Sequence, residues 1–544
     1  MIDAEGMSQP ADEPHTIGRW LDDRAAASGE RTAIDDRGVR IGYALLRERA
    51  QLLAERLRAA GYGPGDRIAT VSGNSIDHVV AFFACAKTGI AFIPLSWRQT
   101  PGELAAAIEG SRPQLVLVED EYAGTADEAL RRIAEPVPSA RLGVVGVEAH
   151  PPHRHARFGA APTRRHVRDD DVALVIFTSG SEGAPKGVML THANCFWNNL
   201  ALAGAAQLTA GDVVLAMLPQ FHVAAWNVQP LLAWWLGATV VLERSFQPDR
   251  VLPLIAERRV SAMMGVPTQY RLLADDPGFA SADLSSLRVV QVGGAAMAPD
   301  LQQAWNARGV ELLAGYGLTE AGPNVLSVMP GHAADSAGTV GMPYPTVEVA
   351  LADPQTGLML EGDVTGELWV RGPSVFAGYL DDPSATARVR SGDWLRTGDL
   401  ARRDAEGRFV LVDRLKDIYI SGGENVAPAE VEHVLCAHPL VEAAAVVGVP
   451  DRVWGERGLA FVQLRAGAVC TADELLAHAR THLSSFKVPV HIEQVAALPR
   501  SGIDKIARAR LREQAAAIMA AHDSAHHSGH HTGSRREGAD EHGH

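Results

Sequence analysis

Short apolar runs alternate with longer segments rich in Ala, Leu and Arg from about residue 17 to residue 410. The run Arg67–Val71 follows the helix-like segment Tyr43–Ala60, and the run Gln114–Val118 follows the helix-like segment Gly102–Gly110. Alternation of short strands with helices is typical of βαβ units, whose strands pair in parallel. The pattern therefore predicts an α/β protein with largely parallel sheets.

The pattern changes towards the C-terminus. A strand-like run at 407–412 precedes the charged turn Asp413–Asp417, where we place a domain boundary. Beyond the turn, the hydrophobic periodicity predicts a compact α+β region. Its expected elements are helices at 429–437 and 472–483 and strands at 441–449 and 459–464. We therefore predict a large domain at 17–415 and a small domain at 416–512.

The two ends of the chain and its charge exclude several classes of protein. The acidic residues 1–16 lack an apolar secretory core, and residues 513–544 end in a tract rich in His, Gly and Ser, so we predict disorder in both. The net charge is −15, which argues against nucleic acid or an anionic membrane as a partner. No apolar run is long enough to span a membrane. The four cysteines are far apart, which indicates unpaired thiols in a reducing cytoplasm.

The segment Thr178–Gly187 has the composition of a phosphate-binding loop. It follows the apolar run Ala173–Ile176 and places three glycines, two serines and a threonine around Lys186. Glycines let backbone N–H groups converge on an anion, and the lysine adds a positive charge. It is not a Walker loop, because Lys186 lies between proline and glycine rather than before serine or threonine. Glu182 places a carboxylate where a polyphosphate would lie.

Five further features of the sequence could contribute to binding a nucleotide. Tyr316–Glu320 offers an aromatic ring for a base, a hydroxyl for a phosphate and a carboxylate for Mg²⁺, and the glycines of Gln291–Ala296 permit close approach of a ligand. Asp399 could accept hydrogen bonds from ribose hydroxyls, although a turn aspartate is the alternative. Arg414 and Lys505 supply cations, and Lys505 serves a site only if a second domain carries it there.

Taken in order, six segments resemble the adenylate-forming superfamily, which includes acyl- and aryl-CoA synthetases, peptide-synthetase adenylation domains and beetle luciferases. The resemblance covers about residues 17–512, and the six segments are 178–187, 219–223, 316–320, 397–400, 413–432 and 498–506. It implies a β-barrel-like subdomain within the large domain and a mobile small domain. It also implies ATP, Mg²⁺ and coenzyme A as cofactors, a small carboxylic acid as substrate, and a monomer or a homodimer.

The resemblance also implies a role for individual residues. ATP would be bound by Thr178, Ser179, Gly180, Ser181, Gly183, Lys186, Gly294, Ala295, Ala296, Tyr316, Gly317, Thr319, Asp399 and Arg414. Glu320 would bind Mg²⁺, Lys416 would be the hinge, and Gly422 with Gly423 would face the site in the second half-reaction. His222 and Lys505 would act at the carboxylate. The substrate pocket would include Phe221, Trp226, Val292, Gly293, Gly315 and Gly322, with a core tryptophan as the alternative for Trp226.

Two features favour a free-standing CoA ligase for a hydrophobic acid. The stretch Val223–Val228 has no acidic residue to hold a substrate ammonium group, unlike amino-acid-activating domains, and no carrier-attachment site follows Arg512. The expected mechanism has two steps, adenylation of the acid by ATP and transfer of the acyl group to a thiol, with the small domain rotating between them.

Two departures from the family pattern leave alternatives open. Glu182 stands where threonine is usual, and Asp504 stands where the family has glycine before the late lysine. Both carboxylates would oppose ATP binding, unless Asp504 points to solvent or pairs with Arg508. One alternative is therefore a ligase that only transfers the acyl group from a supplied acyl-AMP. Another is a non-catalytic protein that binds acyl-adenylate or nucleotide, although Lys505 and Glu320 argue against it.

Overall fold

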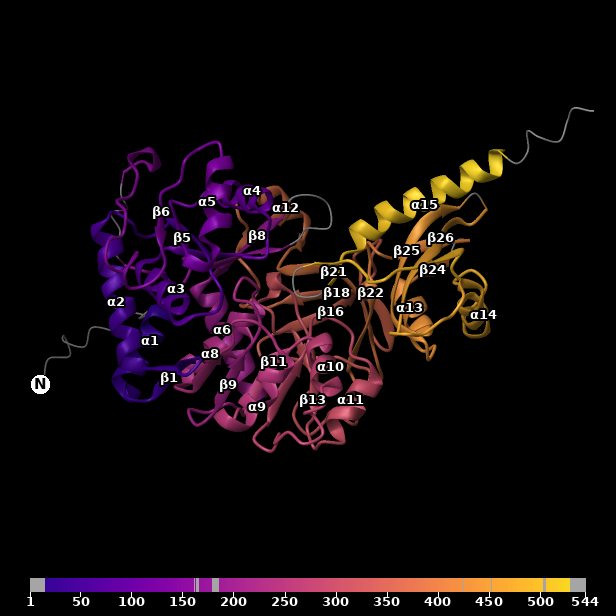
Figure 1. Ribbon diagram of the computed structural model, residues 1–544, viewed down its shortest axis with the longest axis horizontal. Coiled ribbons are helices and arrows are strands. Elements are labelled where there is room, and N and C mark those ends of the chain that lie inside the picture. The colour runs from indigo at the N-terminus through magenta and orange to yellow at the C-terminus, as the bar shows by residue number, and fades with distance from the viewer. Residues whose placement is uncertain are drawn as a thin grey trace, which may run out of the picture. The chain divides into compact units, whose positions relative to one another are not determined.

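The computed structural model describes residues 15–160, 162, 166–178, 185–422, 424–451, 453–501 and 505–528 (Figure 1). Backbone contacts divide the chain into a large unit, Met1–Thr397 with Arg402–Val410, and a small unit, Gly398–Ala401 with Leu411–His544. The fold is mixed α/β with a large N-terminal and a small C-terminal part, which confirms the predicted class.

One sheet of the large unit has seven strands, in the order β19-β8-β7-β4-β3-β5-β6. Its strands are β3 (Arg67–Val71), β4 (Ala91–Leu95), β5 (Leu115–Val118), β6 (Ser139–Arg141), β7 (Val172–Thr178), β8 (Lys186–Thr191) and β19 (Gly378–Tyr379). The strands from β3 to β7 pair in parallel, whereas β8 pairs antiparallel with both neighbours. Helices α4 (Pro101–Ser111) and α5 (Ala123–Arg132) bury apolar side chains against one face. The seven-stranded sheet therefore has parallel strands from β7 to β6, with the antiparallel strands β8 and β19 at one edge.

A second sheet has nine strands, in the order β15-β14-β13-β12-β11-β9-β10-β1-β2. Its strands are β1 (Thr32–Asp36), β2 (Val39–Gly42), β9 (Val213–Ala216), β10 (Thr239–Leu242), β11 (Ala262–Gly265), β12 (Val289–Val292), β13 (Leu312–Tyr316), β14 (Leu326–Ser327) and β15 (Met342–Pro343). Helices α9 (Pro248–Arg258), α10 (Pro267–Asp275) and α11 (Pro299–Asn306) share one apolar core with β9, β11, β12 and β13. Because strand side chains alternate, the other residues of these strands face away from that core.

Further helices belong to the same unit: α1 (Ile17–Ser28), α2 (Tyr43–Ala59), α3 (Ile76–Thr88), α6 (His192–Ala206), α7 (Ala224–Asn227) and α8 (Pro230–Leu236). Helix α2 coincides with the predicted helix at 43–60, and α4 with the one at 102–110. A third sheet has the order β17-β16-β18-β21-β20, with β16 (Glu348–Ala352), β17 (Met359–Leu360), β18 (Val364–Arg371), β20 (Arg390–Ser391) and β21 (Trp394–Arg403). A short helix, α12 (Pro383–Arg388), precedes β20.

The small unit is built on an antiparallel sheet, β24-β23-β26-β25, to which β27 adds in parallel. Its strands are β23 (Tyr419–Ser421), β24 (Glu424–Val426), β25 (Val441–Asp451), β26 (Gly455–Leu464) and β27 (His491–Gln494). Helices α13 (Pro428–Cys436) and α14 (Ala472–His482) pack on one face. The elements predicted for this region therefore occur in the predicted order.

The last helix extends beyond residue 512, where the sequence predicted the end of the small domain. Helix α15 (Arg508–Ser528) continues through the part of 513–544 that was expected to be disordered, and residues 529–544 lie outside the described residues. Leu511 and Ala515 are buried, and Ile518 and Met519 pack on the same core against β25 and β26 (Figure 1). These residues are three or four positions apart, so they lie on one side of helix α15. Sequence analysis did not detect this apolar stripe because the segment is rich in alanine.

All four cysteines are unpaired, as predicted. Within the described part of the chain, no helix is long and apolar enough to cross a membrane.

Candidate active site

The predicted phosphate loop connects two paired strands. In the β7–β8 register, Thr178 lies directly opposite Lys186, and the Thr178 hydroxyl donates a hydrogen bond of 3.5 Å to the carbonyl of Lys186. The antiparallel pair thus fixes both ends of the loop. Five predicted residues, Ser179, Gly180, Ser181, Gly183 and the departure Glu182, lie outside the described residues.

Lys186, Tyr379 and Glu320 lie together although they are far apart in the sequence. The Lys186 Nζ lies 5.2 Å from the centre of the Tyr379 ring, and the Tyr379 hydroxyl donates a hydrogen bond of 2.9 Å to Oε1 of Glu320. Strand β19 places Tyr379 beside β8, where it pairs with Val188. Burial and the adjacent Glu320 carboxylate raise the pKa of Tyr379, so its hydroxyl stays a donor. Sequence analysis missed Tyr379, since nothing local marks it.

The surroundings of Glu320 fit a metal ion shared with a phosphate. The Tyr379 hydroxyl bonds Oε1 of the Glu320 carboxylate. In the described parts of the chain, no three His, Cys, Asp or Glu side chains gather to form a metal cage. Mg²⁺ is usually held by one or two carboxylates together with substrate phosphates and water. The donor set therefore fits an ion that binds with ATP.

The segments expected to contact adenine follow β12 and β13. Gly294, Ala295 and Ala296 are exposed after β12, whereas Tyr316 is buried at the end of β13. A Cβ on Gly317 would lie 1.4 Å from the carbonyl oxygen of Pro323, so only glycine fits there. Thr319 and Glu320 then form a short 3₁₀ turn, 319–321.

Two of the expected pocket residues, Val292 and Trp226, are buried in the apolar core of the large unit. Val292 belongs to the core shared with α9–α11, as does Val290, because side chains alternate along β12. Trp226 is fully buried, packs on Phe82 with ring centres 4.5 Å apart, and donates from Nε1 to the carbonyl of Gln220. The structure thus favours the core alternative for Trp226.

The other expected pocket residues have separate surroundings. Gly293 and Gly315 are adjacent, since a Cβ on Gly293 would lie 3.3 Å from the carbonyl oxygen of Gly315. Phe221 is buried and its ring centre lies 4.5 Å from that of His222. Gly322 packs against the backbone of Ser374, where a Cβ would come within 2.8 Å of the carbonyl oxygen.

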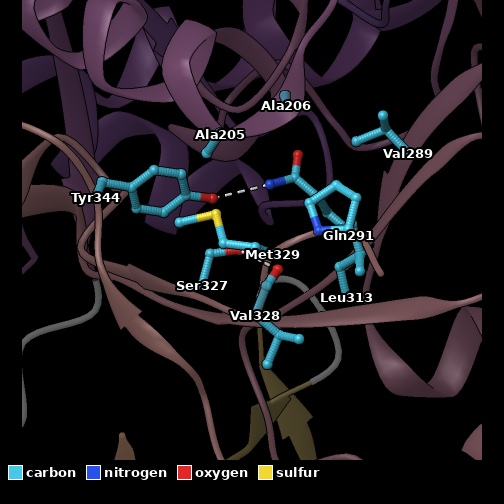
Figure 2. Close-up of a pocket in the computed structure, with 10 residues that line it drawn as sticks. Ala205, Ala206, Val289, Gln291, Leu313, Ser327, Val328, Met329 and Tyr344 are labelled. Atoms are coloured by element: carbon cyan, nitrogen blue, oxygen red, sulfur yellow. Dashed lines mark hydrogen bonds between the residues drawn. The ribbon is translucent and has the colours of Figure 1, made fainter. Parts of the chain in front are cut away.

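A small hollow is lined by residues of α6, β12, β13 and β14 (Figure 2). Ala205 and Ala206 at the end of α6 line it, together with Gln291, Leu313 and Tyr344. Its volume is about 10 Å³, room for no more than about one water molecule, so it is not a ligand pocket. Figure 2 shows the Gln291 amide and the Tyr344 hydroxyl pointing toward each other across it, 2.9 Å apart. Sequence analysis gave neither side chain a role.

The small unit carries the expected ribose residues and the hinge. Arg414 Nε lies 3.2 Å from Oδ1 of Asp399, whose carboxylate is buried. Arg512 donates a hydrogen bond of 3.5 Å to the carbonyl of Lys416 and forms an ion pair with Asp417. Burial first, and then the Arg414 charge, lower the pKa of Lys416. The expected hinge is thus tied to α15 through its carbonyl.

The remaining predicted residues are described only in part. Gly422 has a φ of +62° and donates its N–H to the carbonyl of Trp454, and a Cβ there would clash with the Trp454 ring at 2.5 Å. Gly423 lies outside the described residues, as does Asp504. Lys505 begins β29 (Lys505–Ile506), which pairs with β28 (Arg500–Ser501). Arg508, the partner considered for Asp504, binds both oxygens of Glu432 at 2.6 and 3.0 Å.

This fold and these segments define an adenylate-forming enzyme. The family model of the AMP-binding enzyme matches residues 21–380, and the model of the AMP-binding enzyme C-terminal domain matches residues 430–505. The chain belongs to this family. Together with the relatives below, the match identifies it as an AMP-forming acyl-CoA synthetase, an acid–thiol ligase, and enzymes of the family use ATP and CoA.

Relatives of known activity cover almost the whole chain. A feruloyl-CoA synthase from Amycolatopsis sp is 40% identical over 92% of this chain and 99% of its own length. An indoleacetate–CoA ligase from Aromatoleum aromaticum is 32% identical over 91% of this chain and 98% of its own. The crystal structure of ATP-bound MatB from Rhodopseudomonas palustris has a TM-score of 0.82 at 30% identity, covering 92% of this chain and 99% of that one.

Proposed function

We propose that this enzyme converts a hydrophobic carboxylic acid to its CoA thioester through an enzyme-bound acyl-adenylate. The observation that carries the proposal is the cluster of Lys186, Tyr379 and Glu320 at the ends of the β7–β8 loop. A cation and a carboxylate beside a loop of phosphate-binding composition support the binding of a nucleotide and its metal ion. Relatives that act on ferulate and indoleacetate, both aryl acids, support a hydrophobic acyl group.

In the first step, an oxygen of the carboxylate attacks the α-phosphorus of ATP, and pyrophosphate leaves with the electron pair of the broken P–O bond. The protein contributes positioning and charge neutralisation rather than covalent chemistry. Thr178, Lys186 and Thr319 bind the phosphates, His222 lies at the carboxylate, and Lys505 bridges carboxylate and α-phosphate. Glu320 would hold Mg²⁺, which would neutralise phosphate charge.

In the second step, the thiolate of CoA attacks the acyl carbonyl, the bond to AMP breaks, and the thiol proton goes to solvent. Asp399 and Arg414 hold the ribose of the nucleotide. Lys416 serves as the hinge about which the small unit turns, so that Lys505 serves the first step and Gly422 with Gly423 the second.

A second candidate is an enzyme that only transfers acyl groups from acyl-AMP. The observation that favours it is the sequence itself, which has carboxylates at Glu182 and at Asp504 next to Lys505. Negative charge at these two positions would oppose ATP binding and weaken adenylation.

Two assays test the proposal and separate the candidates. Mass spectrometry of reactions with ATP, CoA and a panel of aryl and alkyl acids should detect a CoA thioester, and ATP–pyrophosphate exchange should depend on the same acid. Lys505→Ala should abolish exchange while retaining thioester formation from synthetic acyl-AMP. Absence of exchange in the unaltered enzyme, with thioester formed from acyl-AMP, would establish the second candidate. No thioester from any acid or acyl-AMP would refute both.

A further inference from the structure

Asn194 lies in the first turn of helix α6, just after strand β8 ends at Thr191. Its backbone N–H donates to the Thr191 hydroxyl at 3.1 Å, and its side-chain oxygen Oδ1 accepts from the Thr191 N–H at 3.0 Å. This reciprocal pair is a capping box for the helix. Because a backbone N–H can only donate, Oδ1 must be the atom at Thr191, and this bond fixes the orientation of the Asn194 amide.

The other end of the Asn194 amide donates to two carbonyl oxygens of a distant segment. These oxygens belong to Pro373 and Val375, and each lies 2.9 Å from Nδ2. The two residues are 179 and 181 positions away along the chain. Asn194 is buried, and both hydrogens of its amide are used. Asn194 therefore holds the segment 373–375 to the start of α6.

The segment that Asn194 holds continues directly into the contacts of Glu320. The Phe376 N–H donates to the backbone carbonyl of Glu320 at 2.9 Å, and the Tyr379 hydroxyl donates to its carboxylate at 2.9 Å. Gly322, two residues after Glu320, packs against Ser374, where a Cβ would come within 2.8 Å of the carbonyl oxygen. Both the backbone and the carboxylate of Glu320 are therefore positioned by this one segment.

The same segment is also paired with the strand that carries the expected phosphate ligand. The Ala377 N–H donates to the carbonyl of Met189 at 3.0 Å, and the Leu380 N–H donates to the carbonyl of Gly187 at 2.7 Å. Both acceptors lie on β8, whose first residue is Lys186. One segment therefore sets the separation between the carboxylate and the lysine.

We propose that Asn194 is a positioning residue for the expected metal ligand: by holding segment 373–375, it keeps Glu320 at the separation from Lys186 that a metal ion and a triphosphate need when they bind together. The proposal rests on the proposed function, since it takes MgATP as the ligand. Without the two donors of Asn194, two carbonyls lose their partner and the segment relaxes. Glu320 is then less well placed to bind the metal ion.

The contribution of Mg²⁺ to nucleotide binding tests this without catalysis. The probe is α,β-methylene-ATP, in which a stable P–C bond replaces the bond that adenylation breaks. Calorimetry measures its affinity in Mg²⁺ and in EDTA, and the ratio of the two affinities reports the part of binding that depends on the metal. We expect this ratio to be at least about tenfold for the unaltered enzyme.

Two matched variants separate the positioning role from helix capping. Asn194→Asp keeps an oxygen for the Thr191 N–H but cannot donate to the two carbonyls, so the ratio should fall at least about fivefold. Thr191→Val removes the hydroxyl that completes the capping box and keeps both donors of Asn194. We therefore expect an unchanged ratio in Thr191→Val.

Tyr379→Phe supplies a second test, because Tyr379 and Asn194 act on the same carboxylate. In the double variant with Asn194→Asp, the ratio should fall by less than the product of the two single effects. If Asn194→Asp does not fold, hydrogen exchange of the unaltered enzyme decides. Adding Mg²⁺ to the enzyme–analogue complex should slow amide exchange in segment 372–380, since the Phe376 N–H is bonded to Glu320.

An unchanged ratio in Asn194→Asp, or an equal fall in Thr191→Val, would overturn the proposal. So would independent effects in the double variant, no slowing of exchange in segment 372–380, or no binding of the analogue to the unaltered enzyme. Because the analogue needs neither acid nor CoA, the expected ratios without thioester formation from any acid would refute the proposed function and leave this inference standing.

Discussion

The hydroxyl of Tyr379 donates a hydrogen bond of 2.9 Å to the Glu320 carboxylate, while the face of the same ring lies near the Lys186 ammonium. One side chain therefore contacts both the expected metal ligand and the expected phosphate ligand. Tyr379 fixes the position of Glu320 without itself occupying the place of a metal or phosphate. We regard it as a positioning residue for ATP and its metal ion.

Tyr379→Phe should weaken the use of MgATP while leaving the fold intact. Loss of one hydrogen bond to a carboxylate costs about 1–2 kcal/mol, so we expect the KM for MgATP to rise about five- to thirtyfold. Pyrophosphate release measured against Mg²⁺ concentration checks this, and a higher Mg²⁺ requirement is the specific sign. Tyr62→Phe is the control, because the buried Tyr62 hydroxyl makes no hydrogen bond to the described residues. An unchanged Mg²⁺ dependence would contradict the role of Tyr379.

Asp399→Ala should remove the recognition of the nucleotide ribose. The buried Asp399 carboxylate pairs with Arg414, and an ionised acceptor of two ribose hydroxyls is worth about 1.5–3 kcal/mol per bond. Unaltered enzyme should therefore prefer ATP over 3′-deoxy-ATP by at least about tenfold in kcat/KM, and Asp399→Ala should show almost no preference. Asp417→Asn, which alters the neighbouring carboxylate paired with Arg512, is the control. A preference that survives in Asp399→Ala would place the ribose elsewhere.

Lys416→Pro should slow one half-reaction far more than the other. Proline fixes φ at the expected hinge, but the carbonyl that accepts from Arg512 remains, so the contact with α15 is kept. We expect at least a tenfold difference between the effects on pyrophosphate exchange and on thioester formation from acyl-AMP. The matched control is Ala405→Pro, the second residue of the turn closed by Gly407 N–H and the Asp404 carbonyl, where proline is tolerated. Equal slowing of both steps would count against Lys416 as the pivot.

The sequence predicted those parts of the molecule that local patterns determine. Helix α2, strand β7 and the elements from α13 to α14 follow from periodicity. The sequence did not predict which side of a strand a residue faces, nor contacts between residues that are far apart along the chain. The family resemblance placed Val292 in the pocket, whereas alternation along β12 turns its side chain into the core.

The missed residues are those whose role depends on a partner far along the chain. Tyr379 meets Glu320 across 59 positions, and Asn194 meets Val375 across 181. Neither pair leaves a local signal in a single sequence, because hydrophobic periodicity reports only which face of an element is buried. The long-range pairing of β8 with β19 brings such residues together.

Acid should destabilise the enzyme through two buried histidines. Burial lowers the pKa of His78 and of His192 from 6.5 to about 4 in the folded protein. His78 Nδ1 donates to Gln220 Oε1, and Nε2 accepts from Thr70, so both ring nitrogens are satisfied in the neutral form. Between pH 6.5 and 4 the unfolded chain binds more protons than the folded one, so the free energy of unfolding falls as pH falls.

We expect His78→Gln to reduce this acid sensitivity. One histidine with these pKa values lowers the free energy of unfolding by about 2.5 kcal/mol between pH 7.5 and pH 4.5. Over the same range, the free energy of unfolding of His78→Gln should therefore fall by about 2.5 kcal/mol less than that of the unaltered enzyme. Urea unfolding at the two pH values measures the difference, which cancels any constant effect of the substitution. His153→Gln, at an exposed position, should keep the pH dependence of the unaltered enzyme. An unchanged pH dependence in His78→Gln would mean that His78 is already protonated, or exposed, in the folded enzyme.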